Sequence, residues 1–167
     1  SPLVLVLTGT DIYRDLELHA QARLSLTLAD QLANDIICHD LKEMNQSLSM
    51  EILIISEEIK NKSYDERKNY EWCWIVDPLD GTKEFIKKND QFTVNIGLSR
   101  NGTPVFGIVS IPVTGEIYYG CEGSGSFKLY DDKVEKLFVK ENHTPIRICV
   151  SNSHLNDETI EYLKKYE

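Results

Sequence analysis

The segment Asp77-Pro78-Leu79-Asp80-Gly81-Thr82 constrains the fold of this chain more than any other feature. It directly follows the apolar run Trp72–Val76, which predicts a buried strand. Because proline donates no backbone hydrogen bond and restricts the residue before it, we expect the strand to stop at Asp77-Pro78. Gly81 then predicts a tight turn into a short helix. The pattern predicts two carboxylates, three residues apart, on a stiff turn at a strand end.

These two aspartates allow two interpretations. Magnesium prefers oxygen ligands in octahedral geometry, and two aspartates at this spacing can bridge two cations. Backbone N–H groups at the start of the following helix, from Gly81 and Thr82, can hold phosphate beside such a metal. Aspartate also caps ordinary turns in Asp-Pro and Asp-Gly contexts. The residue pattern alone leaves both interpretations open.

A second acidic pair, Glu57-Glu58, follows the β-branched run Glu51–Ile55, which predicts another strand. Open α/β sheets tend to bind ligands at strand ends. Most exposed acidic pairs are nevertheless only solvated, and the pattern alone favours that interpretation.

Apolar residues recur at helical spacing from Ala29 and predict a helix over residues 30–44. Thr27 and Asp30 are then interpreted most simply as helix-entry residues. The stretch 60–70 is polar and is expected to be a surface loop.

Three alternating runs predict the strands of an antiparallel meander: 92–98, 105–111 and 116–120. Asn101-Gly102 is a typical hairpin turn. Gly123, Gly125 and the charged run 131–141 indicate turns and exposed segments. Residues 146–150 predict one more strand, and Asn156 is a suitable N-cap for a final helix.

A net charge of −9 disfavours a nucleic-acid polymer as partner, because binding its backbone requires clustered Lys and Arg. An anionic substrate would therefore need a cation as mediator. The four cysteines have no zinc or redox spacing and predict reduced, buried thiols. The apolar run Leu3–Leu7 is too short to span a bilayer, so we expect no stable membrane insertion and a cytoplasmic protein.

Three segments in order carry a resemblance to a known family: Thr27-Leu28-Ala29-Asp30, Ser56-Glu57-Glu58 and Trp74–Phe85. Together they are similar to the inositol monophosphatase superfamily. Lys83-Glu84-Phe85, and Ser151–His154 followed by Leu155, resemble its branch of CysQ-like 3'(2'),5'-bisphosphate nucleotidases.

The resemblance implies two or three Mg2+ ions as cofactors. Glu57, Asp77 and the backbone carbonyl of Leu79 would hold one ion, and Asp77 and Asp80 would contribute to a second. The implied catalytic residues are Asp30, Glu57 and Thr82, with Thr82 and Asp30 paired to orient and deprotonate the attacking water. The resemblance also implies substrate contacts from the backbone of Gly81 and Thr82 and from Ser151 and His154, although His154 alone would be interpreted as an ordinary half-buried histidine.

The implied fold is α+β, in the layered α-β-α-β arrangement of sugar phosphatases. Residues 1–145 would form an N-terminal metal-binding domain whose mixed, largely antiparallel sheet is flanked by helices. Residues 146–167 would begin a truncated C-terminal α/β domain. Residues 1–23 match the family poorly, and its Trp-Asp-x-Ala motif is not found in the sequence, so we expect a fragment or an incomplete chain.

The expected function is magnesium-dependent hydrolysis of 3'-phosphoadenosine 5'-phosphate by metal-activated water. The expected partner is this small phosphate substrate, and no oligomeric state is predicted. Two alternatives stay open. One is an inositol monophosphatase or fructose bisphosphatase-type sugar phosphatase, and the other is a non-catalytic, metal-binding relic of the fold.

Overall fold

The computed structural model describes residues 19–59, 62–139, 148–150 and 156–166. The chain divides into two units, residues 1–137 and 138–167, which are described separately. The predicted domain border at 145/146 lies outside the described residues and stays a prediction.

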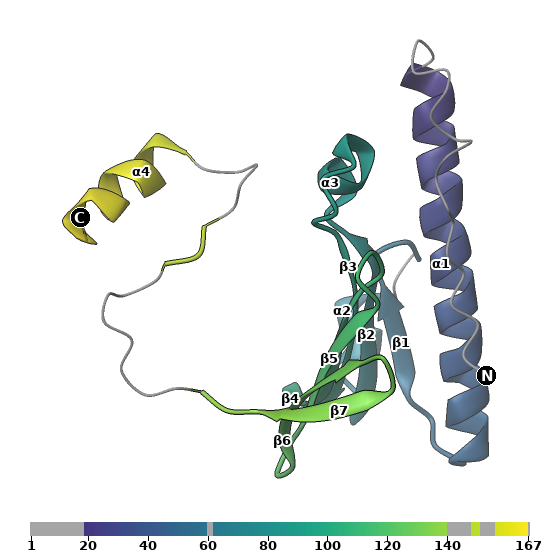
Figure 1. Cartoon of the computed structure of the whole chain (residues 1–167). Helices are drawn as coiled ribbons and strands as arrows, with labels where there is room; N and C mark the ends of the chain where they lie inside the picture. The colour runs from purple at the N-terminus through teal and green to yellow at the C-terminus, as the bar shows by residue number, and fades with distance from the viewer. Residues whose placement is uncertain (1–18, 60–61, 140–147, 151–155, 167) are drawn as a thin grey trace. The chain divides into compact units, whose positions relative to one another are not determined.

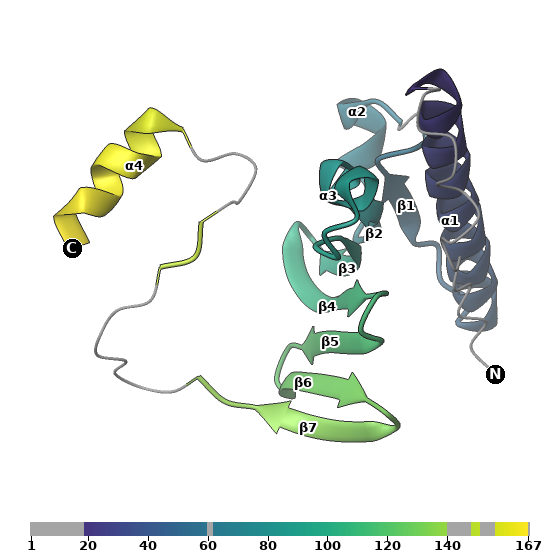
Figure 2. The ribbon, with the colours of Figure 1, turned by 45° about the horizontal axis from the view of Figure 1, so that its top comes forward.

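The first unit is built on one seven-stranded sheet (Figure 1). Its strands are β1 Leu53–Ser56, β2 Trp72–Asp80, β3 Thr93–Arg100, β4 Thr103–Ile111, β5 Glu116–Cys121, β6 Gly125–Tyr130 and β7 Lys133–Leu137. Neighbours in the sheet follow chain order, and Figure 2 shows the strands side by side. The β1–β2 pair is parallel and every other pair is antiparallel. This confirms the expected mixed, largely antiparallel sheet.

Helix α1, His19–Ser47, packs along β1 and β2 (Figures 1 and 2). The core between them consists of Leu41, Ile52, Trp74 and Val76, all less than 9% exposed. Burial of these apolar side chains holds the helix against the strands. The strand ends that follow β1 and β2 are therefore placed beside α1.

Helix α1 begins eleven residues before the predicted start at Asp30. Thr27 and Asp30 lie inside the helix, so their interpretation as helix-entry residues was wrong. The added stretch 19–29 contains no glycine or proline and is rich in alanine and leucine, which favour helix. Helix propensity therefore outweighed the local capping signal.

Strand β2 also runs further than predicted, through Pro78 to Asp80. Asp77 pairs with Asn95, and Asp80 pairs with Thr93, so Pro78 and Leu79 together oppose a single residue. Such a bulge tolerates proline, because its missing N–H falls where the ladder is already interrupted. The predicted turn into a short helix is confirmed by α3, Thr82–Lys87.

Three elements, a hairpin of two strands and a short helix, fall where turns and exposed segments were expected. Strands β6 and β7 form a hairpin whose turn residues Asp131 and Asp132 have φ of 51° and 58°, as two-residue hairpin turns require. A four-residue helix, α2 Tyr64–Arg67, forms in the predicted loop because Ser63 and Glu66 make a reciprocal capping box.

In the second unit, helix α4, Asp157–Leu163, is followed by a single 3-10 turn, η1 Lys164–Tyr166. Asn156 caps α4 as predicted, its side chain accepting from the Thr159 N–H at 2.8 Å. Residues 148–150 form no strand, because no described strand pairs with them.

The cysteines are free, as expected, but only Cys38 is buried. Cys73 is half-buried, and Cys121 and Cys149 are exposed, so the prediction of four buried thiols was wrong. Among the described residues, no helix combines the length and apolar character needed to cross a bilayer.

Candidate metal centre

The parallel pairing of β1 with β2 brings the two acidic segments together. Ser56, the last residue of β1, lies opposite Val76 of β2. Glu57 and Glu58 directly follow β1, and Asp77 and Asp80 lie in the last part of β2. The Glu57 N–H donates to the Val76 carbonyl at 3.3 Å. Glu57 therefore lies beside Asp77, the residue after Val76. The solvated interpretation of the Glu57-Glu58 pair misses this arrangement, because it depends on strand pairing.

Asp30 joins these residues from α1. Its carboxyl group is half-buried and shares a hydrogen bond with Glu58. The pKa of Asp30 is raised from 3.8 to about 6. Burial contributes most to this rise, followed by the charge of Glu58 and its hydrogen bond, and then by the charges of Asp77 and Glu57. The second carboxyl oxygen, Oδ1, is buried and has no hydrogen-bond partner.

Asp77 lies at the bulge of β2 between the other carboxylates. Its Oδ1 accepts from the Leu79 N–H at 3.2 Å, which closes the Asp-Pro-Leu bend. The pKa of Asp77 is raised first by burial and then by the charges of Glu57 and Asp80, against a smaller opposing effect of the Leu79 N–H. The Asp77 carboxylate is thus held among like charges.

Asp80 is oriented by a neighbouring strand. The Asn95 side-chain amide donates to Asp80 Oδ2 at 2.9 Å. The carbonyl oxygen of the same amide, Asn95 Oδ1, is buried without a partner. Asn95 was not identified from the sequence. The available signal was a polar residue between the apolar residues Val94 and Ile96, which the register places opposite Asp77.

This group of side chains fits a divalent cation. Two buried acceptors, Asp30 Oδ1 and Asn95 Oδ1, lack donors, and each belongs to a side chain bonded to a neighbouring carboxylate. An unpaired buried acceptor is costly, and a cation with its water shell supplies the missing positive charge and donors. Among the described residues, no basic side chain lowers the pKa of Asp30 or Asp77. The all-oxygen donor set suits magnesium.

The remaining predicted site residues are placed as follows. Gly81 caps α3 with φ of +95°, and a Cβ there would lie 2.9 Å from the Gln91 carbonyl oxygen, so the turn requires glycine. Thr82 is exposed, and its hydroxyl donates to the Leu79 carbonyl at 3.4 Å. Asp30 shares its hydrogen bond with Glu58, and its pairing with Thr82 through an attacking water stays a prediction. Ser151 and His154 lie outside the described residues.

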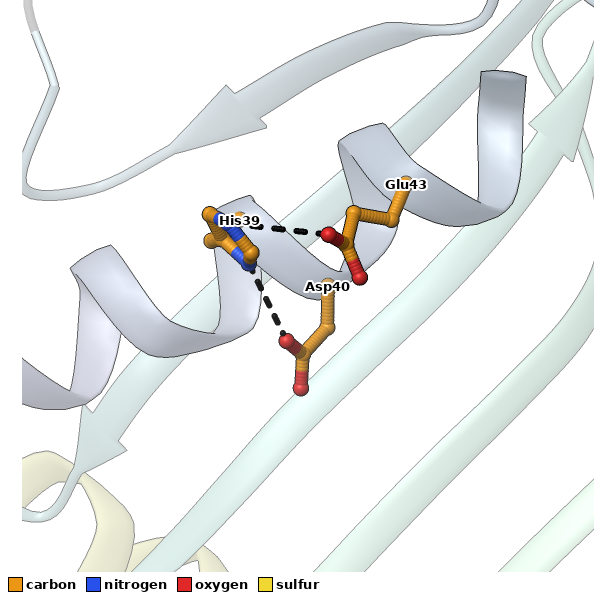
Figure 3. Close-up of side chains that lie close together, drawn as sticks. All are labelled: His39, Asp40 and Glu43. Carbon is orange, nitrogen blue, oxygen red and sulfur yellow. Dashed lines mark hydrogen bonds and ion pairs between the residues drawn. The ribbon is translucent and has the colours of Figure 1, made fainter. Parts of the chain in front are cut away.

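A separate cluster on α1 consists of His39, Asp40 and Glu43 (Figure 3). Among the described residues, it is the one group of three such side chains whose ligating atoms all lie within 4.8 Å of one another, so the carboxylates of the candidate centre are spread more widely. His39 Nδ1 lies 3.4 Å from Asp40, and Nε2 lies 3.8 Å from Glu43. All three side chains are about 70% exposed, which is typical of a solvated helix face.

Comparison with known proteins supports the expected relationship. A sequence profile of the inositol monophosphatase family matches residues 10–166. The 3'(2'),5'-bisphosphate nucleotidase CysQ of Salmonella typhimurium is 39% identical over 140 residues, covering 84% of this chain and 54% of the relative. The CysQ of Escherichia coli K12 is 36% identical over 140 residues with the same coverage. The chain spans about half the length of these relatives.

A solved structure agrees with the sequence comparison. The crystal structure of CysQ from Bacteroides thetaiotaomicron, described as a bacterial member of the inositol monophosphatase family, matches with a TM-score of 0.69 and 35% identity. The match covers 93% of this chain and 60% of that one. The likeness therefore extends over nearly all of the chain.

Proposed function

Because the chain belongs to the inositol monophosphatase family, we propose that it carries the metal centre of a magnesium-dependent phosphatase acting on 3'-phosphoadenosine 5'-phosphate. The observation that carries the proposal is that the carboxyl groups of Asp30, Glu57 and Asp77 lie close together. Two buried oxygens of this site, Asp30 Oδ1 and Asn95 Oδ1, have no hydrogen-bond donor. The substrate class is supported by the similarity to bisphosphate nucleotidases.

Within this proposal, Glu57, Asp77 and the Leu79 carbonyl hold one magnesium ion, and Asp77 and Asp80 contribute to another. When bound, magnesium lowers the pKa of water and neutralises charge on the phosphate ester oxygens. Asn95 keeps the Asp80 carboxylate in one orientation through its 2.9 Å hydrogen bond. Acidic side chains outnumber Lys and Arg by 27 to 18, which suits a site whose positive charge comes from metal.

The proposed proton acceptor is Asp30. Its raised pKa, about 6, lies close to neutral pH, where a carboxylate can both take and release a proton. Its Oδ1 has no protein donor and is thus available to a water molecule. Thr82 is proposed to orient that water with Asp30, and the backbone N–H groups of Gly81 and Thr82 to bind the phosphate. Ser151 and His154 are proposed to contact the nucleotide.

Phosphate release from 3'-phosphoadenosine 5'-phosphate tests the proposal, with and without Mg2+ and beside inositol 1-phosphate. We expect Mg2+-dependent release from the nucleotide, lost in Asp77→Asn. Asp40→Asn is the matched control, since it removes one carboxylate from the exposed α1 cluster and should leave activity unchanged.

Other outcomes separate the alternatives. Faster release from inositol 1-phosphate would contradict the nucleotide as substrate and favour an inositol monophosphatase. Mg2+ binding without release from either compound would favour a non-catalytic metal-binding protein. Loss of activity in Asp40→Asn but not in Asp77→Asn would indicate that the metal binds at the exposed cluster of His39, Asp40 and Glu43 instead.

A further inference from the structure

A buried polar pair connects α1 to the end of β1. Asn34 and Ser56 are each 1% exposed, and their hydrogen bond lies between the helix and the sheet. The Ser56 hydroxyl donates to Asn34 Oδ1 at 2.6 Å, joining residues 22 apart in sequence. Within α1, Cys38 Sγ donates to the same Asn34 oxygen at 3.4 Å, and the Asn34 side-chain NH2 donates to Asp35 Oδ1 at 3.2 Å. The amide of Asn34 is thus held in one orientation.

The two ends of this pair are next to the acidic residues of the candidate centre. Asn34 follows Asp30 by four residues, so both lie on the same face of α1. Ser56 directly precedes Glu57, and its hydroxyl accepts from the Glu58 N–H at 3.4 Å. One buried hydrogen bond therefore connects the helix turn that carries Asp30 to the turn that carries both glutamates.

The carboxylates on these two turns repel one another when ionised. Asp30 lies near Glu57 and Glu58, and no described backbone hydrogen bond joins α1 to β1 to hold the two turns together. A buried, fully enclosed hydrogen bond can resist this repulsion, because breaking it leaves polar atoms without partners.

We propose that the Asn34–Ser56 hydrogen bond is a positioning device that fixes Asp30 relative to Glu57 and Glu58, and thereby sets the affinity of the centre for Mg2+. This inference rests on the proposed function of the same site. Residues that orient metal-binding carboxylates typically change metal affinity by about 10- to 100-fold when they are removed.

The chain offers a matched control nearer the C-terminal end of α1. Asn45, eleven residues after Asn34, is also buried and also connects the helix to the strands. Its amide donates to the Ile52 carbonyl at 3.0 Å and accepts from Trp74 Nε1 at 3.1 Å. Since three helical turns separate it from Asn34, Asn45 is expected to hold the core without affecting the acidic residues.

Isothermal titration of the full 167-residue chain with MgCl2 tests the inference, together with urea unfolding of each variant. Asn34→Ala and Asn45→Ala are both expected to lower the unfolding midpoint. Only Asn34→Ala is expected to raise the Kd for Mg2+, by about tenfold. Ser56→Ala is the second variant, because it removes one hydroxyl from a buried site and keeps the chain foldable.

Ser56→Ala is expected to raise the Kd as Asn34→Ala does, and the double variant should show no further rise, because both changes break the same bond. An unchanged Kd in Ser56→Ala, or equal rises of the Kd in Asn34→Ala and Asn45→Ala, would overturn this inference and leave the proposed function intact. Failure of the unmodified protein to bind Mg2+ would overturn the proposed function, and the inference with it.

Discussion

Replacement of Asp30 by asparagine is expected to stabilise the metal-free protein at neutral pH. The change keeps the size of the side chain, and its amide can still donate to Glu58. It removes a half-buried negative charge that lies near three other carboxylates. The proposed proton acceptor would be lost, so stability should rise while activity falls.

The size of the expected change in unfolding free energy follows from the pKa of Asp30. A carboxyl group whose pKa is raised from 3.8 to about 6 binds its proton more tightly in the folded than in the unfolded state. The folded state therefore loses stability as the pH rises from about 4 to 6, and the loss is complete above that range. At about 1.4 kcal/mol per pH unit the upper limit is about 3 kcal/mol, and solvent screening of this partly exposed group reduces it to about 1–2 kcal/mol.

Urea unfolding in EDTA at pH 7.5 and at pH 4.5 measures this effect. Asp30→Asn should gain about 1–2 kcal/mol over the unmodified protein at pH 7.5 and less than half of that at pH 4.5. The exposed-site variant Asp40→Asn should change little at either pH. A destabilised Asp30→Asn at pH 7.5, or an equal gain at both pH values, would refute the reasoning.

Three further predictions concern the turn after β2 and its neighbours. Asp77→Asn should abolish both Mg2+-dependent turnover and the rise in unfolding midpoint on adding Mg2+, with an unchanged circular dichroism spectrum; full activity would contradict the metal centre. Gly81→Ala should cost about 1–3 kcal/mol in urea unfolding, because φ is +95° and the new Cβ meets the Gln91 carbonyl at 2.9 Å; unaltered stability would contradict this strain. Asn95→Leu should weaken Mg2+ binding about tenfold in calorimetry through the lost bond to Asp80, and an equal Kd would show that Asp80 needs no such support.

Features that depend on a few adjacent residues could be predicted from the sequence. The turn from Asp80 into α3 and the cap of α4 by Asn156 depend on glycine, proline and short polar side chains acting over one turn. The order of the β3–β5 strands followed from alternation and from the Asn101-Gly102 turn. Boundaries were less predictable. The start of α1 depends on helix propensity summed over residues 19–29, and the passage of β2 through Pro78 depends on its pairing with β3, which is distant in sequence.

The order of the residues specifies which chemical groups are present: acidic pairs after two predicted strands, an aspartate on a preceding helix, and a net charge of −9. Which of these groups meet depends on the packing of the folded chain. Asp30 reaches Glu58, 28 residues away, because core packing places α1 beside β1, and the same packing buries Asn34 against Ser56. The raised pKa values of Asp30 and Asp77 likewise exist only in the folded chain, because burial and the proximity of like charges are properties of the assembled site.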